Sequence, residues 1–182
     1  MTAQRLGTLV LGLLCSAAAT AAEFRFDASS SQLEFTGDYG GEAVPGIFKK
    51  FSGKASFDPT APLSTRFETE IDVSSLDTDY PERDETLLST DFFDAGQHPT
   101  ARWVSSGDCT LADGALQCPG NLTLRGATHP VPLTIKASAD GRELSGTATL
   151  DRSQFGVGSG DWLDPETIAH RVAIRFTLKP AG

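Results

Sequence analysis

Residues 71–103 read IDVSSLDTDYPERDETLLSTDFFDAGQHPTARW, and within this stretch strand periodicity gives way to a helix. Upstream, apolar and polar side chains alternate over residues 66–73, the period-two pattern of a strand with one buried face. Asp79 can then cap a helix that begins at Tyr80 or Pro81, because proline favours the first helical position. A single short helix in an otherwise all-β chain typically closes or flanks a barrel.

Short alternating segments recur along the rest of the chain. They span residues 32–36, 51–57, 121–125, 131–136, 143–150 and 171–179. Turn signals such as Asp58-Pro59, Gly126-Ala127 and Asp140-Gly141 separate them. Regular short strands with tight turns predict an all-β, antiparallel barrel or sandwich with one buried face. Since no internal repeat or linker interrupts the pattern, we expect one domain.

The predicted inward positions are not uniformly bulky. Small residues occupy several of them, namely Gly53, Ala55, Thr69, Ala137, Gly146 and Ala148. A solid small barrel fills such positions with branched side chains, so small residues there leave room for a ligand. The alternative is that facing aromatic side chains, from eleven Phe and two Trp residues, fill that room. The pattern alone leaves both interpretations open.

The first residues have the organisation of a secretory signal peptide. Arg5 is followed by the apolar run 9–15 and then by small residues as far as Ala22, and cleavage fits after Ala21 or Ala22. The apolar run is too short for a permanent membrane anchor. We therefore predict that residues 1–22 are a cleaved leader and that residues 23–182 form one exported domain.

Two further observations bear on compartment and partners. Cys15 offers a lipoprotein interpretation of the leader, which the bulky Leu14 before it disfavours. The formal net charge is −9 at pH 7, and an acidic surface argues against nucleic acid or an anionic membrane surface as a partner.

Two cysteines remain after the leader, Cys109 and Cys118, on either side of the turn signal Asp113-Gly114. Counting outward from this turn places Ala112 opposite Ala115, Leu111 opposite Leu116, Thr110 opposite Gln117, and Cys109 opposite Cys118. Facing sulfurs in an exported protein predict a structural disulfide. The rival interpretation, a redox-active pair, normally has closer spacing and a helix start.

Residues that commonly perform catalysis are scattered. The three histidines, His98, His129 and His170, have no Cys or His partner at metal-ligand spacing, so we predict no metal site. Five carboxylates lie in or near the predicted helix, namely Asp77, Asp79, Asp84, Asp91 and Asp94. We interpret them as helix caps and solvated turn residues, in preference to general acid–base catalysts.

Two short motifs near the helix and the C-terminus also have alternatives. Arg83 and Asp84 form either a helix-surface pair or an anchor that fixes the helix on the barrel rim. Residues 156–160, Gly-Val-Gly-Ser-Gly, lack the strand-turn-helix context of a dinucleotide loop, and we interpret them as a glycine-rich turn.

Nearly all of the chain after the leader carries motifs that occur together in one family. They are Phe48-x-x-Phe51-x-Gly53, Phe57-Asp58-Pro59, Ile71-Asp72-Val73-x-Ser75-Leu76-Asp77-Thr78, Glu82-Arg83-Asp84-x-x-Leu87, Asp91-Phe92-Phe93-Asp94, His98-Pro99-Thr100-Ala101, Gly120-x-Leu122-Thr123-Leu124-Arg125-Gly126, and Asp151-Arg152-x-x-Phe155-Gly156-Val157-Gly158. In this combination the chain resembles the YceI family of exported proteins. The later run Gly158-x-Gly160-Asp161-Trp162 resembles the branch that also occurs joined to cytochrome b561-like membrane domains.

The resemblance implies a lipocalin-like antiparallel β-barrel with a hydrophobic tunnel that binds a polyisoprenoid in the periplasm, without catalysis. It implies no metal and no cofactor other than a bound isoprenoid quinone or polyprenyl lipid. The side chains expected to line or close the tunnel are Phe35, Phe51, Phe57, Phe67, Ile71, Leu87, Phe92, Phe93, Trp103, Leu122, Leu133 and Phe155. An acidic mouth would favour a neutral, quinone-like head group.

Two other function classes stay open on sequence grounds. One is a docking or electron-transfer module for a cytochrome b561-like membrane partner, with a solid core and no deep ligand. The other is an isoprenoid-modifying enzyme that uses Asp84 or His129. Dimers are common for such folds, although no segment specifies an interface. The glycine-rich, acidic segment 37–43 and the cysteine pair both depart from the usual family pattern.

Overall fold

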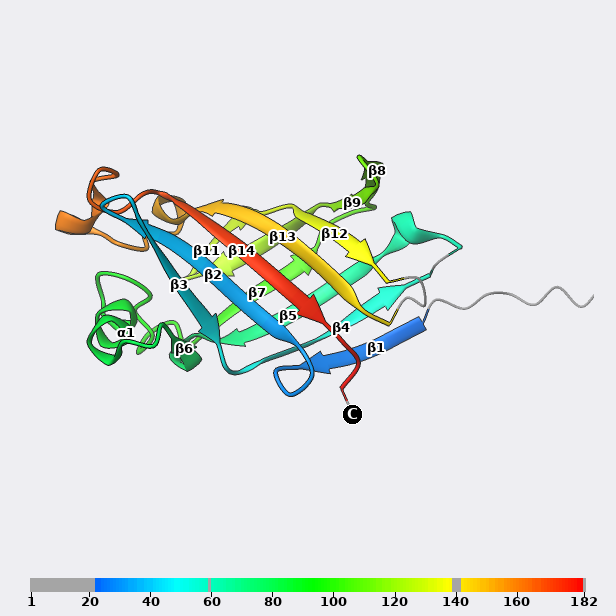
Figure 1. Ribbon diagram of the computed structural model, residues 1–182, viewed down its shortest axis with the longest axis horizontal. Helices are drawn as coiled ribbons and strands as arrows, with labels where there is room; N and C mark the ends of the chain where they lie inside the picture. The colour runs from blue at the N-terminus through cyan, green and yellow to red at the C-terminus, as the bar shows by residue number, and fades with distance from the viewer. Residues whose placement is uncertain (1–21, 59, 139–141, 182) are drawn as a thin grey trace, which may run out of the picture.

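The computed structural model describes residues 22–58, 60–138 and 142–181. The predicted leader lies outside these residues except for Ala22, the first residue of the first strand. Two antiparallel sheets curve around a shared apolar interior (Figure 1). The first sheet has the strand order β1 (Ala22–Asp27), β4 (Phe51–Phe57), β5 (Arg66–Asp72), β7 (Thr100–Ser105), β10 (Gly120–Leu124) and β11 (Ala127–Pro130).

The second sheet contains the remaining eight strands. Their order is β6 (Leu76–Asp77), β3 (Glu42–Phe48), β2 (Gln32–Tyr39), β14 (Arg171–Leu178), β13 (Leu144–Asp151), β12 (Leu133–Ala137), β9 (Ala115–Cys118) and β8 (Thr110–Ala112). The predicted all-β, antiparallel class is confirmed. Across the described residues, however, the hydrogen-bonded ladders form two strongly curved sheets and do not join into one closed barrel.

Prolines mark two places where the chain changes sheet. Pro119 separates β9 from β10, and Pro132 follows β11 before β12 begins. Proline cannot donate to a strand ladder, which favours ending one pairing and starting another. Short 3₁₀ turns make other connections, namely η1 (Pro62–Ser64), η2 (Val73–Ser75), η3 (Arg152–Phe155) and η4 (Gly160–Leu163).

The one α-helix in the described residues, α1 (Pro81–Leu88), begins with proline as expected, but its cap differs from the prediction. Tyr80 occupies the N-cap position, and no side chain caps the helix there. Asp79 instead adopts a positive φ of 59°, a left-handed turn that aspartate tolerates, and so stands one residue too early to cap. No helix of the described residues is long and apolar enough to cross a membrane.

Side chains on α1 anchor the helix to the segment before it. The Asp84 carboxylate accepts hydrogen bonds from Thr78 N at 3.0 Å and from Thr78 Oγ1 at 2.5 Å. Arg83 donates from Nε to Thr78 Oγ1 at 2.8 Å and from Nη2 to the Thr78 carbonyl at 2.6 Å. Of the two interpretations of Arg83 and Asp84, the structure shows the anchor.

The predicted disulfide is present at the opposite end of the molecule from α1. Cys109 and Cys118 are joined with an S–S distance of 2.02 Å, and the predicted pairing of Thr110, Leu111 and Ala112 with β9 is confirmed. Asp113 and Gly114 have φ of 51° and 72°, the two left-handed residues that a type I′ hairpin turn requires.

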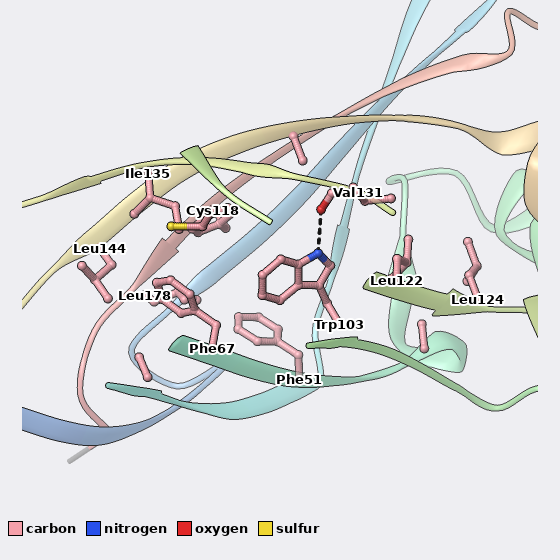
Figure 2. Packing of buried hydrophobic residues seen from close by; sticks show 14 of the residues in the cluster. Phe51, Phe67, Trp103, Cys118, Leu122, Leu124, Val131, Ile135, Leu144 and Leu178 are labelled. Carbon is pink, nitrogen blue, oxygen red and sulfur yellow. Dashed lines mark hydrogen bonds between the residues drawn. The ribbon is translucent and has the colours of Figure 1, made fainter. Parts of the chain in front are cut away.

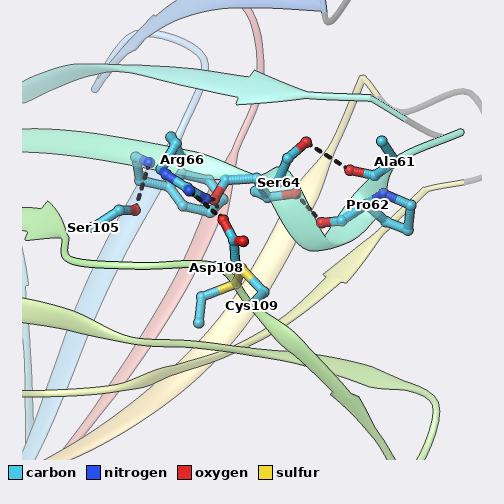
Figure 3. Close-up of polar contacts among 10 residues, drawn as sticks. Ala61, Pro62, Ser64, Arg66, Ser105, Asp108 and Cys109 are labelled. Carbon is cyan, nitrogen blue, oxygen red and sulfur yellow. Dashed lines mark hydrogen bonds and ion pairs between the residues drawn. A yellow bond between two sulfur atoms is a disulfide. The ribbon is translucent and has the colours of Figure 1, made fainter.

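Polar contacts tie the disulfide hairpin to the first sheet. Cys109 N donates to the Leu63 carbonyl at 2.8 Å, and Arg66 forms an ion pair with Asp108 (Figure 3). Phe67 N donates to Ser105 Oγ at 2.8 Å on the neighbouring strand. The disulfide, the η1 turn and the end of β7 therefore form one connected unit at this end.

Candidate functional site

The two sheets enclose a cavity of about 560 Å³. This volume lies within the range of about 300–1,000 Å³ typical of small-molecule sites. The wall is formed mainly by apolar side chains that alternate inward from β2, β13 and β14 on one sheet and β5, β7 and β10 on the other. Period-two alternation thus places one face of each strand against the cavity.

The cavity opens at the α1 end. Among the residues that line it, the exposed ones are Tyr39, Tyr80, Glu82 and Thr86. Tyr39 ends β2, and the other three lie at the start of α1 or within it. Lining residues from the middle of the strands are buried or half-buried. The mouth therefore lies beside α1, at the end of the molecule that also holds β6 (Figure 1).

Aromatic side chains surround the interior of the mouth. Phe93 packs edge-on against Phe48 with ring centroids 6.3 Å apart, and Phe48 lies 5.4 Å from Phe35. Phe92 packs against Trp162 at 5.5 Å. All five line the cavity, so the segment after α1 and the η4 turn are joined to the wall by ring contacts.

The small inward residues have two roles. Some of them make room for an aromatic ring of the core, and others make room in the cavity, so each of the two interpretations of the sequence holds at some positions. A Cβ on Gly53 would come within 2.5 Å of the Phe26 ring, and one on Gly146 within 2.5 Å of the Phe176 ring. These glycines therefore accommodate aromatic rings that lie flat on the sheet. Thr69 and Ala148, in contrast, line the cavity and contribute to its volume.

Arg152 is a buried cation beside the cavity, with 3% of its surface exposed. All five of its N–H groups donate to main-chain carbonyls. Nε reaches Ala169 at 3.1 Å; Nη1 reaches Val157 and Gly158 at 2.8 and 3.0 Å; Nη2 reaches Trp162 and Ile168 at 2.7 and 2.6 Å. Burial lowers the pKa of Arg152, although a guanidinium stays protonated.

The carbonyls around Arg152 come from the glycine-rich turn and the loop before β14. Gly158 has a φ of 76°, and a Cβ there would come within 2.2 Å of Arg152 Nη1. Glycine is therefore required both for the backbone conformation and for the space. Arg152 thereby joins the turn at 156–160 to Trp162 and Ile168, which both line the cavity.

Four charged side chains line the cavity, Asp38, Glu82, Arg83 and Arg152. Every donor of Arg152 is occupied, and Arg83 is engaged with Thr78. The carboxylates of Asp38 and Glu82 belong to half-buried and exposed residues at the mouth. A ligand head group that enters here meets carboxylates more readily than free cationic donors.

The structure places most of the predicted tunnel residues on the wall of this cavity. Those on the wall are Phe35, Phe67, Ile71, Leu87, Phe92, Phe93, Trp103, Leu122 and Leu133. Phe51, Phe57 and Phe155 differ from the expectation, since they are buried in the core away from the wall. Alternation along a strand identifies the inward face but gives no information about depth along the interior, which accounts for Phe51 and Phe57.

Phe155 departs for a different reason, because it lies in η3 and not on a strand. Its ring packs edge-on against His129 with centroids 5.1 Å apart. His129 and Asp84, the residues considered for an enzymatic role, are both absent from the cavity wall. Among the described residues no group of three or more His, Cys, Asp or Glu side chains is arranged to hold a metal ion.

Sequence reasoning missed several wall residues, notably Phe48, Tyr80, Arg152 and Trp162. Arg152 carries a usable signal, since it lies four residues before the glycine-rich turn at 156–160, whose main-chain carbonyls have no strand partner. Trp162 and Tyr80 lie outside strands, so strand alternation could not have identified them.

Comparison with known proteins finds one family over nearly all of the described residues. The family model described as a YceI-like domain matches residues 24–179. A UPF0312 protein of Ectopseudomonas mendocina is 31% identical over 169 residues, with 86% of this chain and 88% of that protein covered. A UPF0312 protein of Pseudomonas paraeruginosa is 32% identical over 170 residues, with the same coverage.

Solved structures show the same fold. BcnA of Burkholderia cenocepacia superposes with a TM-score of 0.75 at 31% identity, covering 86% of this chain and 99% of that one. A polyisoprenoid binding domain from Saccharophagus degradans, implicated in plant cell wall breakdown, superposes with a TM-score of 0.64 at 16% identity, covering 88% and 99%. The latter similarity is one of fold.

Proposed function

Because this chain belongs to the YceI family, we propose that it is an exported periplasmic protein that binds a long apolar isoprenoid, a quinone or a polyprenyl lipid, between its two sheets. The observation that carries the proposal is the apolar cavity of about 560 Å³ with its mouth beside α1. A solid core would have left no space for such a ligand. The shared fold with a polyisoprenoid binding domain supports the ligand class.

The proposed binding energy comes mainly from burial of the isoprenoid chain. Removal of apolar surface from water contributes about 25 cal/mol per Å² before the costs of ordering the ligand. The inner wall offers Phe, Leu, Ile, Val and Ala side chains, and the charged side chains stand toward the mouth. The chain would therefore enter first, and the head group would remain near α1.

The head group is proposed to be neutral. Asp38 and Glu82 would repel a phosphate, while the donors of Arg152 are already used by carbonyls. Arg152 is thus unable to offset the carboxylates by direct hydrogen bonds without losing its present contacts, and two of the five N–H donors of Arg83 are already used by Thr78. A quinone ring or an alcohol carries no charge to be repelled.

Export is part of the same proposal. The leader at residues 1–22 has the features of a cleaved signal peptide, and a buried disulfide is expected where the compartment is oxidising. Binding without catalysis is proposed because the wall is mainly apolar and holds neither Asp84 nor His129.

Native mass spectrometry tests the binding proposal directly. The protein is purified from the periplasm without detergent and its bound material is then extracted into organic solvent. A stoichiometric adduct with the mass of a quinone or polyprenyl lipid supports the proposal. An apo protein that stays apo when isoprenoids are supplied contradicts it, and directs attention to the alternative, a docking module for a cytochrome b561-like partner.

A second experiment tests the head group. Farnesol and farnesyl phosphate have the same isoprenoid chain and differ only in their head groups. A difference in affinity between them therefore measures the contribution of the head group. We expect the wild type to prefer the alcohol, and the double variant Asp38→Asn/Glu82→Gln to lose most of that preference. Equal affinity of the wild type for the two compounds would overturn the neutral-head assignment while leaving isoprenoid binding intact.

A further inference from the structure

Large apolar side chains of this protein mostly pack in the interior. Figure 2 shows Phe67, Trp103 and Leu178 among them, and even the indole Nε1 of Trp103 donates to a carbonyl there, that of Val131, at 2.9 Å. Six large apolar side chains of the described residues are exposed instead. Three of these six surround the mouth of the cavity, namely Tyr39 (54% exposed), Tyr80 (55%) and Leu163 (51%).

These three side chains, which we call the apolar rim, come from three separate elements. Tyr39 ends β2, Tyr80 is the N-cap of α1, and both line the cavity. Leu163 ends η4, directly after the wall residue Trp162. Figure 1 shows α1, the turn between β2 and β3, and the orange loop that contains η4 at the same end of the molecule. The exposed apolar surface thus frames the opening.

Main-chain contacts hold the rim in place. Tyr39 is joined to Ile168 by an isolated β-bridge. The carbonyls of Ile168 and Trp162 accept hydrogen bonds from one nitrogen, Nη2 of Arg152, at 2.6 and 2.7 Å. His170 Nε2 lies 2.8 Å from the Leu163 carbonyl oxygen. An apolar surface that is already ordered loses little conformational freedom when a partner binds to it.

The rim is also acidic. Each of its three members has two carboxylates within three residues in the sequence, and five of these six carboxylates belong to exposed residues. None of the six forms an ion pair with another described residue. They are Asp38 and Glu42 near Tyr39, Asp79 and Glu82 near Tyr80, and Asp161 and Asp164 near Leu163.

Two occupants of such a rim are disfavoured by its charge. Exposed aromatic side chains suit the interface of a membrane, but an anionic phospholipid surface repels carboxylates. A second copy of this chain is disfavoured for the same reason, because a two-fold dimer brings the same patch of both subunits together. An apolar patch framed by unpaired carboxylates is complementary to an apolar patch framed by cations.

We propose that the apolar rim and its carboxylates are a docking surface for a cationic protein, one that presents apolar side chains surrounded by Lys or Arg. Apolar contacts at the centre of the interface supply affinity, and the surrounding charges supply orientation and a fast encounter. A partner bound here covers the mouth, so that a guest passes between the two proteins without crossing water. The inference goes beyond the proposed function and does not depend on which guest the cavity holds.

Two matched peptides test the proposal. Both are short amphipathic helices with the same pattern of leucines, and their polar positions are all Lys in one peptide and all Glu in the other. Binding to the mature protein is measured by fluorescence anisotropy. We expect the Lys peptide to bind at least about tenfold more tightly than the Glu peptide, and we expect high salt to remove most of that difference.

Because the whole chain has a net charge of −9, a control must separate the rim from general attraction. Asp79→Asn/Asp161→Asn should weaken binding of the Lys peptide several-fold. Glu23→Gln/Asp113→Asn removes the same charge away from the mouth and should leave binding nearly unchanged. Asp79 and Asp113 both have positive φ, which asparagine tolerates, so the two variants are matched in backbone as well.

The apolar part of the surface has its own pair of variants. Leu163→Ser should weaken binding of both peptides. Leu111→Ser is the control, since Leu111 is 68% exposed and lies on β8, in the disulfide hairpin. Neither leucine lies on the cavity wall, so both variants leave the cavity unchanged.

Several outcomes overturn the proposal. They are a Lys peptide that does not bind, equal affinity for the two peptides, and control variants that weaken binding as much as the rim variants. Adsorption to vesicles of phosphatidylcholine and phosphatidylglycerol that Leu163→Ser abolishes assigns the rim to a membrane instead. A dimer that Leu163→Ser dissociates in sedimentation assigns it to a second copy. The test needs no isoprenoid, so its failure leaves the proposed function standing.

Discussion

Arg152→Met is expected to destabilise the fold severely, and the structure allows the loss to be bounded. Of the five carbonyls that the guanidinium binds, those of Val157 and Gly158 belong to buried residues, where water does not readily replace the lost donor. A hydrogen bond from a charged donor contributes about 1.5–3 kcal/mol, so these two bonds correspond to about 3–6 kcal/mol. Removing a desolvated charge offsets part of this loss.

The expected net decrease in the free energy of unfolding is therefore about 3–4 kcal/mol. Urea denaturation followed by circular dichroism measures it, with the slope checked for a change in the unfolded surface. Arg152→Lys is the matched control, because it keeps the charge but has fewer donors and should recover only part of the loss. A decrease below about 1 kcal/mol for Arg152→Met would refute the view that these bonds hold the 156–169 region together.

Three further perturbations have expected outcomes. Replacing both Cys109 and Cys118 with alanine should lower the free energy of unfolding by roughly 2–3 kcal/mol, measured in urea, and should leave the proposed isoprenoid binding in place. A hydrogen bond from the Ser153 hydroxyl, the largest cause, keeps the pKa of Asp151 below its usual value. The ionised Asp151 carboxylate therefore stabilises the fold at pH values above its unfolded pKa. This contribution is lost as the pH falls through the lower pKa of the folded state. Asp151→Asn should flatten the decline in the free energy of unfolding between about pH 5 and pH 2. Asp84→Ala removes the acceptor that anchors the start of α1 and should cost about 1–2 kcal/mol, with faster amide exchange in the helix as the second readout.

The elements that sequence predicted best are those in which local chemistry determines geometry. The 109–118 hairpin has the expected register because Asp113-Gly114 adopts the two left-handed conformations that one turn type requires. The helix α1 begins at Pro81, one of the two predicted starts, but its N-cap is Tyr80 and not Asp79, whose positive φ turns it away from the helix. The pairing of the outer strands depends on contacts between distant segments, and the closed barrel expected from the resemblance became two curved sheets.

The sequence predicted which face of each strand points into the interior, but not which of the inward side chains line the cavity. Inward alternation identified Trp103 and Leu122, which lie on the wall, but it also included Phe57, which is buried off the wall. A period of two does not distinguish a position on the cavity wall from one in the packed core. Arg152 was missed because its partners are carbonyls of a loop whose path is set by tertiary packing.

The apolar interior is unevenly packed. Phe26, Ile135 and Leu144 are almost completely buried and lie off the cavity wall, whereas Leu33, Trp162 and Ile174 line the cavity and are only half-buried. Other wall residues, such as Phe67 and Phe176, belong to the apolar core as well. Substitutions at the half-buried wall positions therefore change the shape of the cavity at less cost to folding than substitutions in the core, and these positions are the natural place to redesign this protein as a container for other apolar molecules.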